Sequence, residues 1–316
     1  MKIFKKGKKL VTHDGSFHAD DIFACATLLL VLDKKKERAK IFRTRDQNII
    51  KKGDYVFDIG GIYDAERNLF DHHQIGGAGK RPARNAFSIA DAGGENNIEY
   101  SSFGLVWKKF GEEVCGNKEV ADFIDQKLVS PIDADDNGIN LYKNNFENIL
   151  PYTINDVLSI FKPTSLENLN IDKQFLKALE LAKVILKREI KKNNDQIEIT
   201  KIIQNYYKNS KDKRLIIIEK PEVSRYEIWD ALQDFTEPLF IVYKTDEWRI
   251  VAMRLNINSF ENRKNFPKVW AGLIDKEFQK ISGVEDAIFC HRGLFLAGAK
   301  SKEGAIKLAQ IALINN

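Results

Sequence analysis

The sequence predicts an α/β protein in which an N-terminal domain with a parallel sheet precedes a smaller α/β domain. Short apolar runs alternate with longer helical segments, an order typical of parallel sheets. Several of these runs end at acidic or histidine residues, and parallel sheets carry their sites at the carboxyl ends of strands. The length of 316 residues is enough for two domains. We place the boundary between residues 195 and 196 and expect the active site in the cleft between the domains.

Within the N-terminal domain, apolar runs bounded by polar or glycine residues predict the strands, and helical periodicity with capping residues predicts the helices. Strands are expected over residues 9–12, 41–44 and 55–59. Helices are expected over residues 20–32, from 101 or 102 to 110, over 117–136 and over 153–161. Gly111 is expected to end the second of these helices.

A long helix over residues 171–192 leads towards the second domain. The surrounding segment, 172–214, holds 12 basic and 6 acidic residues and is typical of a connector. Strands are then expected over 215–218, 239–243 and 248–253, and a final helix over 304–313.

The composition excludes several classes of protein. The net charge of +5 permits an anionic partner without requiring one. Three cysteines without a CxxC pair argue against a disulfide scaffold or a thiolate zinc site and favour a reducing compartment. The longest apolar run, 22–32, is too short to cross a bilayer. We therefore expect a cytoplasmic protein with no membrane partner.

The five histidines are unevenly distributed, because four of them lie in two short clusters beside carboxylates. The clusters rich in possible ligands are THDGSFHADD (12–21), DIGG (58–61), NLFDHHQ (68–74) and SPIDADDNG (130–138). Each one alone is typical of a solvated or outer-sphere group. Together they offer imidazole and carboxylate without thiolate, which suits two divalent ions, Mn²⁺ first and otherwise Mg²⁺, Co²⁺ or Zn²⁺. Such a pair needs a bridging carboxylate, and Asp58, alone at a strand end, is the candidate.

These residues resemble the DHH phosphoesterase superfamily, whose name matches Asp71-His72-His73. The resemblance is closer to the melanocyte-proliferating-gene (Myg-type) hydrolases and exonucleases. Four blocks carry it over most of the chain: THDGSFHADDIFACA, YDAERNLFDHHQ, SSFGLVWKKFG and FCHRGLFLAGAKSKEGAIKLA. The usual first DHH motif is His-x3-Asp-x-Asp, whereas here it is His13-x4-His18-x-Asp20, which leaves the metal preference open.

The resemblance implies roles for individual residues. One metal would bind His13, His18 and Asp58, and the other Asp20, Asp58, His72 and Asp136. Asp136 is preferred to Asp133 and Asp135 because it precedes Asn137-Gly138, and Asp133 is a candidate outer partner. Asp71 would orient a ligating histidine, and His73 would face the substrate phosphate as a general acid or a charge stabiliser. Residues 1–195 would form the catalytic domain and 196–316 the substrate-binding domain.

Two glycine-containing segments are candidates for phosphate binding. In the C-terminal domain the candidates are His291, Arg292, Gly293, Gly298 and Lys300. In the loop after the histidine pair they are Lys80, Arg81 and Arg84. Both segments also have an explanation without a ligand. The C-terminal residues could belong to a packed strand and turn, and the loop after the histidine pair could be flexible and solvated.

The resemblance implies a two-metal phosphoester hydrolase, and specifically a 3′–5′ exonuclease on RNA or single-stranded DNA. The basic connector with Tyr206 and Tyr207 suits a single strand. The alternatives are a small-molecule phosphatase or pyrophosphatase, or a phosphodiesterase of short oligonucleotides, with the same metal centre. A metal-dependent binding module without catalysis is a third reading, which the intact ligand set argues against. The oligomeric state stays open, and a homodimer is one possibility.

Overall fold

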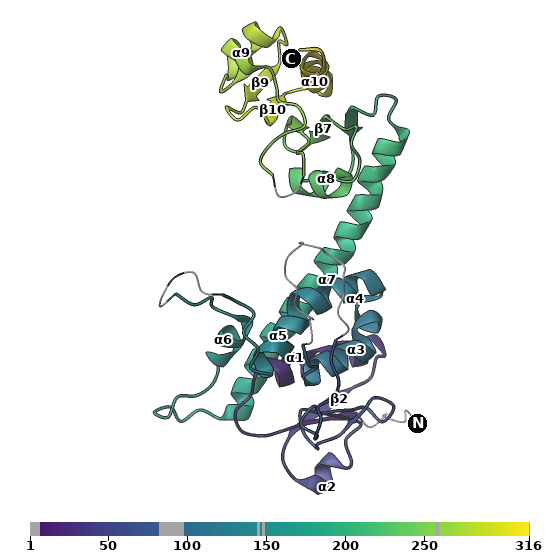
Figure 1. The fold of residues 1–316 in the computed structure, drawn as a ribbon, viewed down its shortest axis with the longest axis vertical. Coiled ribbons are helices and arrows are strands. Elements are labelled where there is room, and N and C mark those ends of the chain that lie inside the picture. Colours follow the sequence, from purple (N-terminus) through teal and green to yellow (C-terminus); the bar gives the residue numbers. More distant parts are fainter. Residues whose placement is uncertain (1–6, 82–97, 144–145, 147–148, 257–258, 316) are drawn as a thin grey trace, which may run out of the picture. The chain divides into compact units, whose positions relative to one another are not determined.

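The computed structural model describes residues 7–81, 98–143, 146, 149–256 and 259–315. The chain divides into two compact units, Met1–Asn194 and Asp195–Asn316. Helices and strands occur in both, and the predicted α/β class is confirmed (Figure 1). No helix within the described ranges is long and apolar enough to cross a membrane.

The N-terminal unit contains a five-stranded sheet in the order β2-β1-β3-β5-β4. The strands are β1 (Lys8–Thr12), β2 (Ala39–Arg43), β3 (Tyr55–Phe57), β4 (Tyr63–Asp64) and β5 (Leu69–Phe70). All neighbouring pairs are parallel except β4 with β5. The carboxyl ends of β1, β3 and β5 therefore meet at one edge of the sheet.

The N-terminal unit also contains several helices, of which the first is buried over most of its length. They are α1 (Ala19–Lys34), α2 (Gln47–Ile50), α3 (Ser102–Cys115), α4 (Lys118–Ile124), the π-helical turn Asp125–Val129, α5 (Ser130–Asp136) and α6 (Ile154–Ser159). Helix α7 (Ile171–Asn209) contains the division between the units and runs past the predicted end at residue 192. The Phe23 ring of α1 stacks on Phe103 of α3 with centroids 5.3 Å apart, which fixes two helices that carry site residues.

One predicted helix end is corrected, and one predicted helix contains an unexpected turn. Gly111 does not end α3, which continues to Cys115 and ends at Gly116 with a φ of 70°. A Cβ on Gly111 would lie 2.8 Å from Nε1 of Trp107, so glycine is there for space. The helix expected over 117–136 is confirmed: Asn117 caps its start, it ends at Asp136, and it contains the π-helical turn Asp125–Val129.

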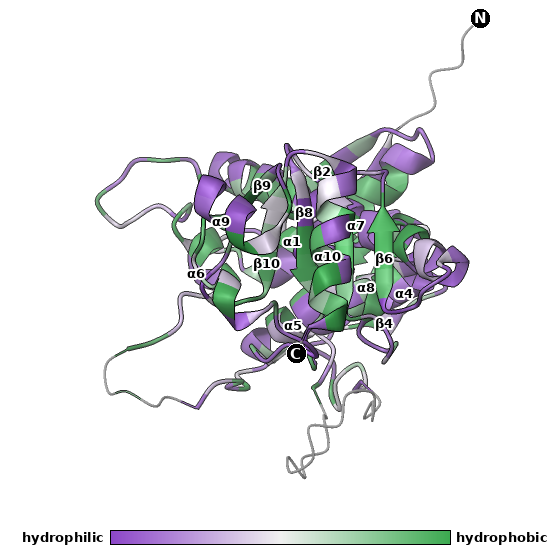
Figure 2. Ribbon diagram, turned by 90° about the horizontal axis from the view of Figure 1, so that it is seen from above, coloured by the Kyte–Doolittle hydropathy of each residue, from purple (hydrophilic) through white to green (hydrophobic). Residues whose placement is uncertain are grey.

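The C-terminal unit has a mainly antiparallel sheet in the order β6-β7-β8-β10-β9, in which only β6 and β7 are parallel. Its strands are β6 (Leu215–Ile218), β7 (Phe240–Lys244), β8 (Trp248–Ala252), β9 (Ala287–Cys290) and β10 (Leu296–Ala299). Its helical elements are α8 (Arg225–Leu232), the short 3₁₀ turn Lys268–Trp270, α9 (Asp275–Ser282) and α10 (Lys302–Ile314). Leu308 and Ala312 of α10 share a core with Phe240 of β7, and both β6 and α10 are largely hydrophobic (Figure 2).

Candidate metal centre

The candidate ligands lie where three parallel strands end. His13 follows β1, Asp58 follows β3, and the run 71–73 follows β5. The start of α1 and the end of α5 complete the site. A cavity of about 780 Å³ is lined by all eight residues expected at the centre: His13, His18, Asp20, Asp58, Asp71, His72, His73 and Asp136.

Asp58 lies at the middle of this group. Its carboxylate is 3.1 Å from Nε2 of His13, 3.5 Å from Nε2 of His72 and 3.7 Å from Nδ1 of His73. Its φ of 54° is uncommon for a residue other than glycine, and such conformations cluster at functional sites. Burial alone would raise the pKa of Asp58, but the hydrogen bond from His13 and the neighbouring His72 ring lower it to about 2. Asp58 is therefore an ionised carboxylate that three imidazoles share.

His13 is held in the orientation that suits a metal ligand. Its Nδ1 lies 2.9 Å from the backbone oxygen of Asp14, which accepts a hydrogen bond and leaves Nε2 facing Asp58. A histidine ligand commonly gives its second nitrogen to such an acceptor. Burial opposes the charged ring, but the hydrogen bond to Asp58 and the charge of Asp21 raise the pKa of His13 to about 9.

Two buried carboxylates at the start of α1 each have one oxygen without a hydrogen-bond partner among the described residues. Oδ1 of Asp20 accepts hydrogen bonds from the Ser101 hydroxyl and, at 2.6 Å, from the Phe103 N–H. Oδ1 of Asp21 accepts the His18 N–H at 2.9 Å and caps the helix. The Oδ2 atom of each finds no hydrogen-bond partner among the described residues. Burial is the main cause that raises the pKa of Asp20, and it raises that of Asp21 to about 7.

His72 and Asp136 face each other across the same cavity. Nε2 of His72 lies 3.2 Å from Oδ2 of Asp136 but makes no hydrogen bond with any described residue. Burial opposes the charged ring, yet the Asp58 and Asp136 carboxylates raise the pKa of His72. Burial also raises the pKa of Asp136 to about 6. A buried nitrogen that points at two carboxylates without bonding to either is the arrangement that a shared cation would satisfy.

Three groups of donor atoms are close enough to hold an ion, with all atoms of a group within 4.8 Å of one another. They are Asp58-His72-His73, His13-Asp21-Asp58 and Asp20-His72-Asp136. All donors are nitrogen or oxygen, and three of their atoms make no hydrogen bond with a described residue, so the chemistry fits divalent ions of the Mn²⁺ type.

The groups differ in part from the ligand sets expected above. Asp21, which the sequence did not single out, stands beside His13 and Asp58 in the position expected of His18. His18 lines the same cavity, with its ring centroid 6.2 Å from that of His13. Burial and the Lys162 ammonium lower the pKa of His18, so its ring stays neutral and able to ligate. The ligand role of His18 stays a prediction.

Asp71 contacts a different histidine from the one expected. Oδ1 of Asp71 lies 2.7 Å from Nδ1 of His73, and Oδ2 accepts the Gly61 N–H at 2.5 Å. Asp71 is 2% exposed, whereas the side chain of His73 is 64% exposed. Asp71 therefore orients the exposed ring of His73 through Nδ1, and His73 lines the cavity.

Arg81 is corrected from a phosphate-gripping residue to a structural one. It is 8% exposed, and its guanidinium donates to Asp133 at 2.5 Å and to Asp125 at 2.9 Å. Asp133 in turn accepts the Gly104 N–H and the hydroxyl of Ser101. Ser101 also bonds to Asp20. Arg81 is therefore connected to the candidate ligand Asp20 through Asp133 and Ser101, and its guanidinium is used in these contacts and not for a substrate.

The other candidates for phosphate binding have mixed outcomes. Lys80 pairs with Glu99 at 3.1 Å, and Arg84 lies outside the described residues. Gly298 is buried in β10, where a Cβ would lie 2.8 Å from the Phe289 ring, so packing alone accounts for it.

Of the remaining C-terminal candidates, His291, Arg292 and Gly293 lie in an exposed turn before β10, and Lys300 directly follows β10. Arg292, Gly293 and Lys300 are exposed, and Nδ1 of His291 accepts the Gly293 N–H at 3.0 Å. Their role in binding substrate, and the site expected between the two domains, stay predictions.

Sequence reasoning missed two polar residues that line the cavity. Arg45 donates to Asp14 at 3.1 Å and brings a cation to a cavity rich in carboxylates. Asn155 of α6 accepts the Ala19 N–H at 3.3 Å and ties α6 to the start of α1. Both residues lie outside the four ligand-rich clusters, so no signal in the sequence points to them.

Comparison with known proteins gives consistent relatives. A family model described as MYG1_exonuc, "Uncharacterised protein family (UPF0160)", matches residues 9–313. A MYG1 protein of Chlamydia pneumoniae is 30% identical over 311 residues, which cover 97% of each chain. The MYG1 exonuclease of Homo sapiens is 26% identical over 343 residues, covering 96% of this chain and 85% of the relative. RecJ of Thermus thermophilus in complex with Mn²⁺ aligns over 98% of this chain and 53% of its own, at 14% identity and a TM-score of 0.27, which is too low for a structural argument.

Proposed function

The chain belongs to the MYG1 family, and we propose that it is a two-metal phosphoester hydrolase acting as a 3′–5′ exonuclease on RNA or single-stranded DNA. The observation that carries the proposal is the position of Asp58, whose carboxylate three histidines approach within 3.7 Å. The name "exonuclease" of the human and bovine relatives supports nucleic acid as the substrate.

The residues proposed to hold the metals come from the three donor groups, with Asp58 shared. Asp20, Asp58, His72 and Asp136 would hold one ion, and His13 and Asp58, with Asp21 or His18, the other. Two divalent ions about 3.5–4 Å apart would supply charge to the transferred phosphoryl group and acidify water.

The remaining residues have roles that follow from their contacts. His73, oriented by Asp71 through Nδ1, lines the cavity, and in its doubly protonated form its Nε2–H can hydrogen bond to a phosphate oxygen or give a proton to the leaving oxygen. Arg45 lines the same cavity and can pair with a second phosphate oxygen. The polar side chains therefore supply both a proton donor and a cation for a phosphoester.

A small-phosphoester hydrolase, or a phosphodiesterase of short oligonucleotides, is the second candidate. A cavity of about 780 Å³ falls in the range of small-molecule sites. The metal centre would be unchanged, and only the permitted length of the substrate would differ.

The test offers several substrates to the same protein. Chelator-treated protein would be reloaded with Mn²⁺ and given a 5′-labelled RNA, the matching DNA strand and pyrophosphate in parallel. Stepwise shortening of an oligonucleotide would support the exonuclease, and turnover of pyrophosphate alone would support the second candidate. The variant His72→Ala should lose at least 10–100-fold in metal affinity or activity, the scale seen for even outer partners of metal ligands. Near-normal Mn²⁺-dependent activity of that variant would refute the ligand assignment.

A further inference from the structure

A second cavity adjoins the metal centre and has a different chemical character. It encloses about 600 Å³ between α5 and the segment that leads into α6. Ile132, Asp135 and Asn155 line both cavities. The part of a polymeric substrate next to a phosphate at the metal centre would therefore lie close to this second cavity.

Exposed tyrosines and apolar side chains form much of its lining. Tyr142 is 53% exposed, Tyr152 is 70% exposed and Leu150 is 73% exposed. Pro131 and Pro151 add rigid apolar surface. Large side chains left exposed next to a polar site are typical of a binding surface, and aromatic rings stack on nucleobases of any sequence.

The charges in the second cavity are unfavourable for phosphate. Asp135 and Asp156 line it, whereas its lysine, Lys127, already pairs with Glu189 at 3.0 Å. Carboxylates repel a phosphate but accept hydrogen bonds from the amino groups of bases. The cavity therefore suits the uncharged base of a nucleotide better than its phosphate.

We propose that this second cavity binds the nucleobase next to the phosphoester held at the metal centre, with Tyr142 and Tyr152 as its stacking surfaces. The inference rests on the proposed function, and it adds that the preferred substrate spans both cavities and so has at least two nucleotides. A single nucleotide fills only one of the two spaces and is a poorer substrate.

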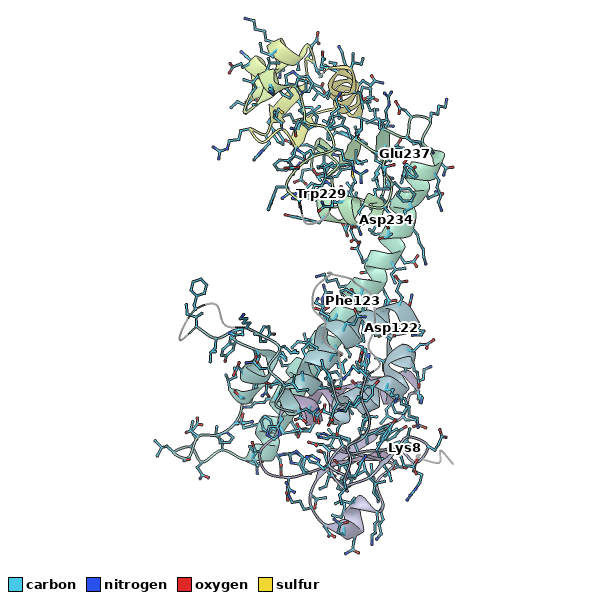
Figure 3. All side chains as sticks on the ribbon, in the orientation of Figure 1. Lys8, Asp122, Phe123, Trp229, Asp234 and Glu237 are labelled. Carbon is cyan, nitrogen blue, oxygen red and sulfur yellow. The ribbon has the colours of Figure 1, made fainter. Side chains whose placement is uncertain are left out.

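The variants that test this remove the rings while leaving the metal centre intact. Tyr142→Ala and Tyr152→Ala delete the stacking surfaces, and Tyr142→Phe and Tyr152→Phe keep the ring. Phe123→Ala is the matched control, because Phe123, labelled in Figure 3, is 47% exposed on α4 and is not among the residues that line either cavity. Bound Mn²⁺ per chain would be measured for every variant.

Two readouts separate this proposal from the exonuclease itself. The first is KM for a short single-stranded RNA compared with turnover of pyrophosphate, which has no base. The second is quenching of 2-aminopurine in the same RNA, which reports base stacking even if no bond is cleaved. Each Tyr→Ala variant should raise KM about 10–100-fold and lose the quenching, as expected for one lost stack. The Tyr→Phe variants, Phe123→Ala, pyrophosphate turnover and bound metal should stay within about twofold of wild type.

Each other outcome decides the matter. KM and quenching within twofold of wild type in both Tyr→Ala variants would overturn the base site while leaving the exonuclease standing. Quenching that depends on the tyrosines in a protein that cleaves no phosphoester would keep the base site and reject the proposed function. Absence of quenching in the wild-type protein, with or without binding of another molecule to this surface, would reject the base site.

Discussion

Replacing the shared carboxylate by its amide, Asp58→Asn, is the sharpest perturbation of the metal centre. Asparagine tolerates the left-handed backbone that Asp58 adopts at a φ of 54°, whereas alanine there would add strain of about 1–2 kcal/mol. The amide has nearly the shape of the carboxylate but lacks its charge. The variant should therefore fold normally and lose only the negative charge that three histidines face.

The magnitude follows from the contacts of Asp58. The carboxylate belongs to two of the three donor groups, so the variant weakens the sites of both ions. Loss of an outer partner costs about 10–100-fold in metal affinity, so loss of a shared ligand should cost at least about 100-fold, or about 3 kcal/mol. The pKa of His13, about 9 in the metal-free protein, should fall towards or below its ordinary value because Asp58 is its main stabilising partner.

The assay combines metal titration by calorimetry with NMR titration of the His13 ring in chelator-treated protein. Asp64→Asn removes the same charge from β4, outside the cavity, and serves as the control. Two ions bound with affinities within threefold of wild type, or an unchanged pKa of His13, would show that Asp58 is not the shared ligand.

Three further predictions concern the support of the centre and its pH dependence. Ser101→Ala removes the hydroxyl that bonds to Asp20 and should weaken metal binding about 10–100-fold, as measured by calorimetry. In the control Ser102→Ala, metal binding should stay unchanged, because the buried Ser102 hydroxyl has no hydrogen-bond partner among the described residues. Gly104→Ala should lower the free energy of unfolding by about 1–3 kcal/mol in a urea titration, since its Cβ would overlap Oδ2 of Asp133, and an unchanged midpoint would contradict this. Because the folded-state pKa of His13, about 9, lies above its unfolded value of about 6.5, the metal-free fold binds more protons in this range and should lose about 3 kcal/mol of stability as pH rises from 6.5 to 9. Urea unfolding in chelator at the two pH values tests this, and equal stability at both would contradict the paired histidine.

The parts of the site that sequence could predict are those set by local pattern. His13 and Asp58 each follow a short buried strand, and parallel strands bring their carboxyl ends together, so their convergence was predictable. Asp71 was singled out by the Asp-His-His run, whereas the strand β5 that ends directly before it is only two residues long and was not expected from the sequence.

Residues whose roles depend on distant partners were not predictable. Arg81 lies in a glycine-rich loop that suggests phosphate binding, but its partners Asp125 and Asp133 are 44 and 52 residues away. Asp21 looks like an ordinary residue of a helix start, and only the fold turns its second oxygen towards His13, 3.4 Å from Nε2. Gly111 resembles a residue that ends a helix, but the structure shows that a Cβ there would collide with the Trp107 ring.

Local periodicity likewise predicts elements better than their pairing. The strands over 215–218 and 239–243 were expected, but apolar runs alone do not reveal that β8, β9 and β10 make this sheet mainly antiparallel. Pairing depends on contacts between segments that are far apart in the chain.

The most direct test of the central claim is the rate of hydrolysis of a 5′-labelled single-stranded RNA as a function of bound Mn²⁺ per chain. Chelator-treated protein should be inactive, and activity should rise with added metal and saturate at two bound ions. Hydrolysis that is undiminished without metal, or two bound ions with no phosphoester cleaved, would contradict a two-metal hydrolase centred on Asp58.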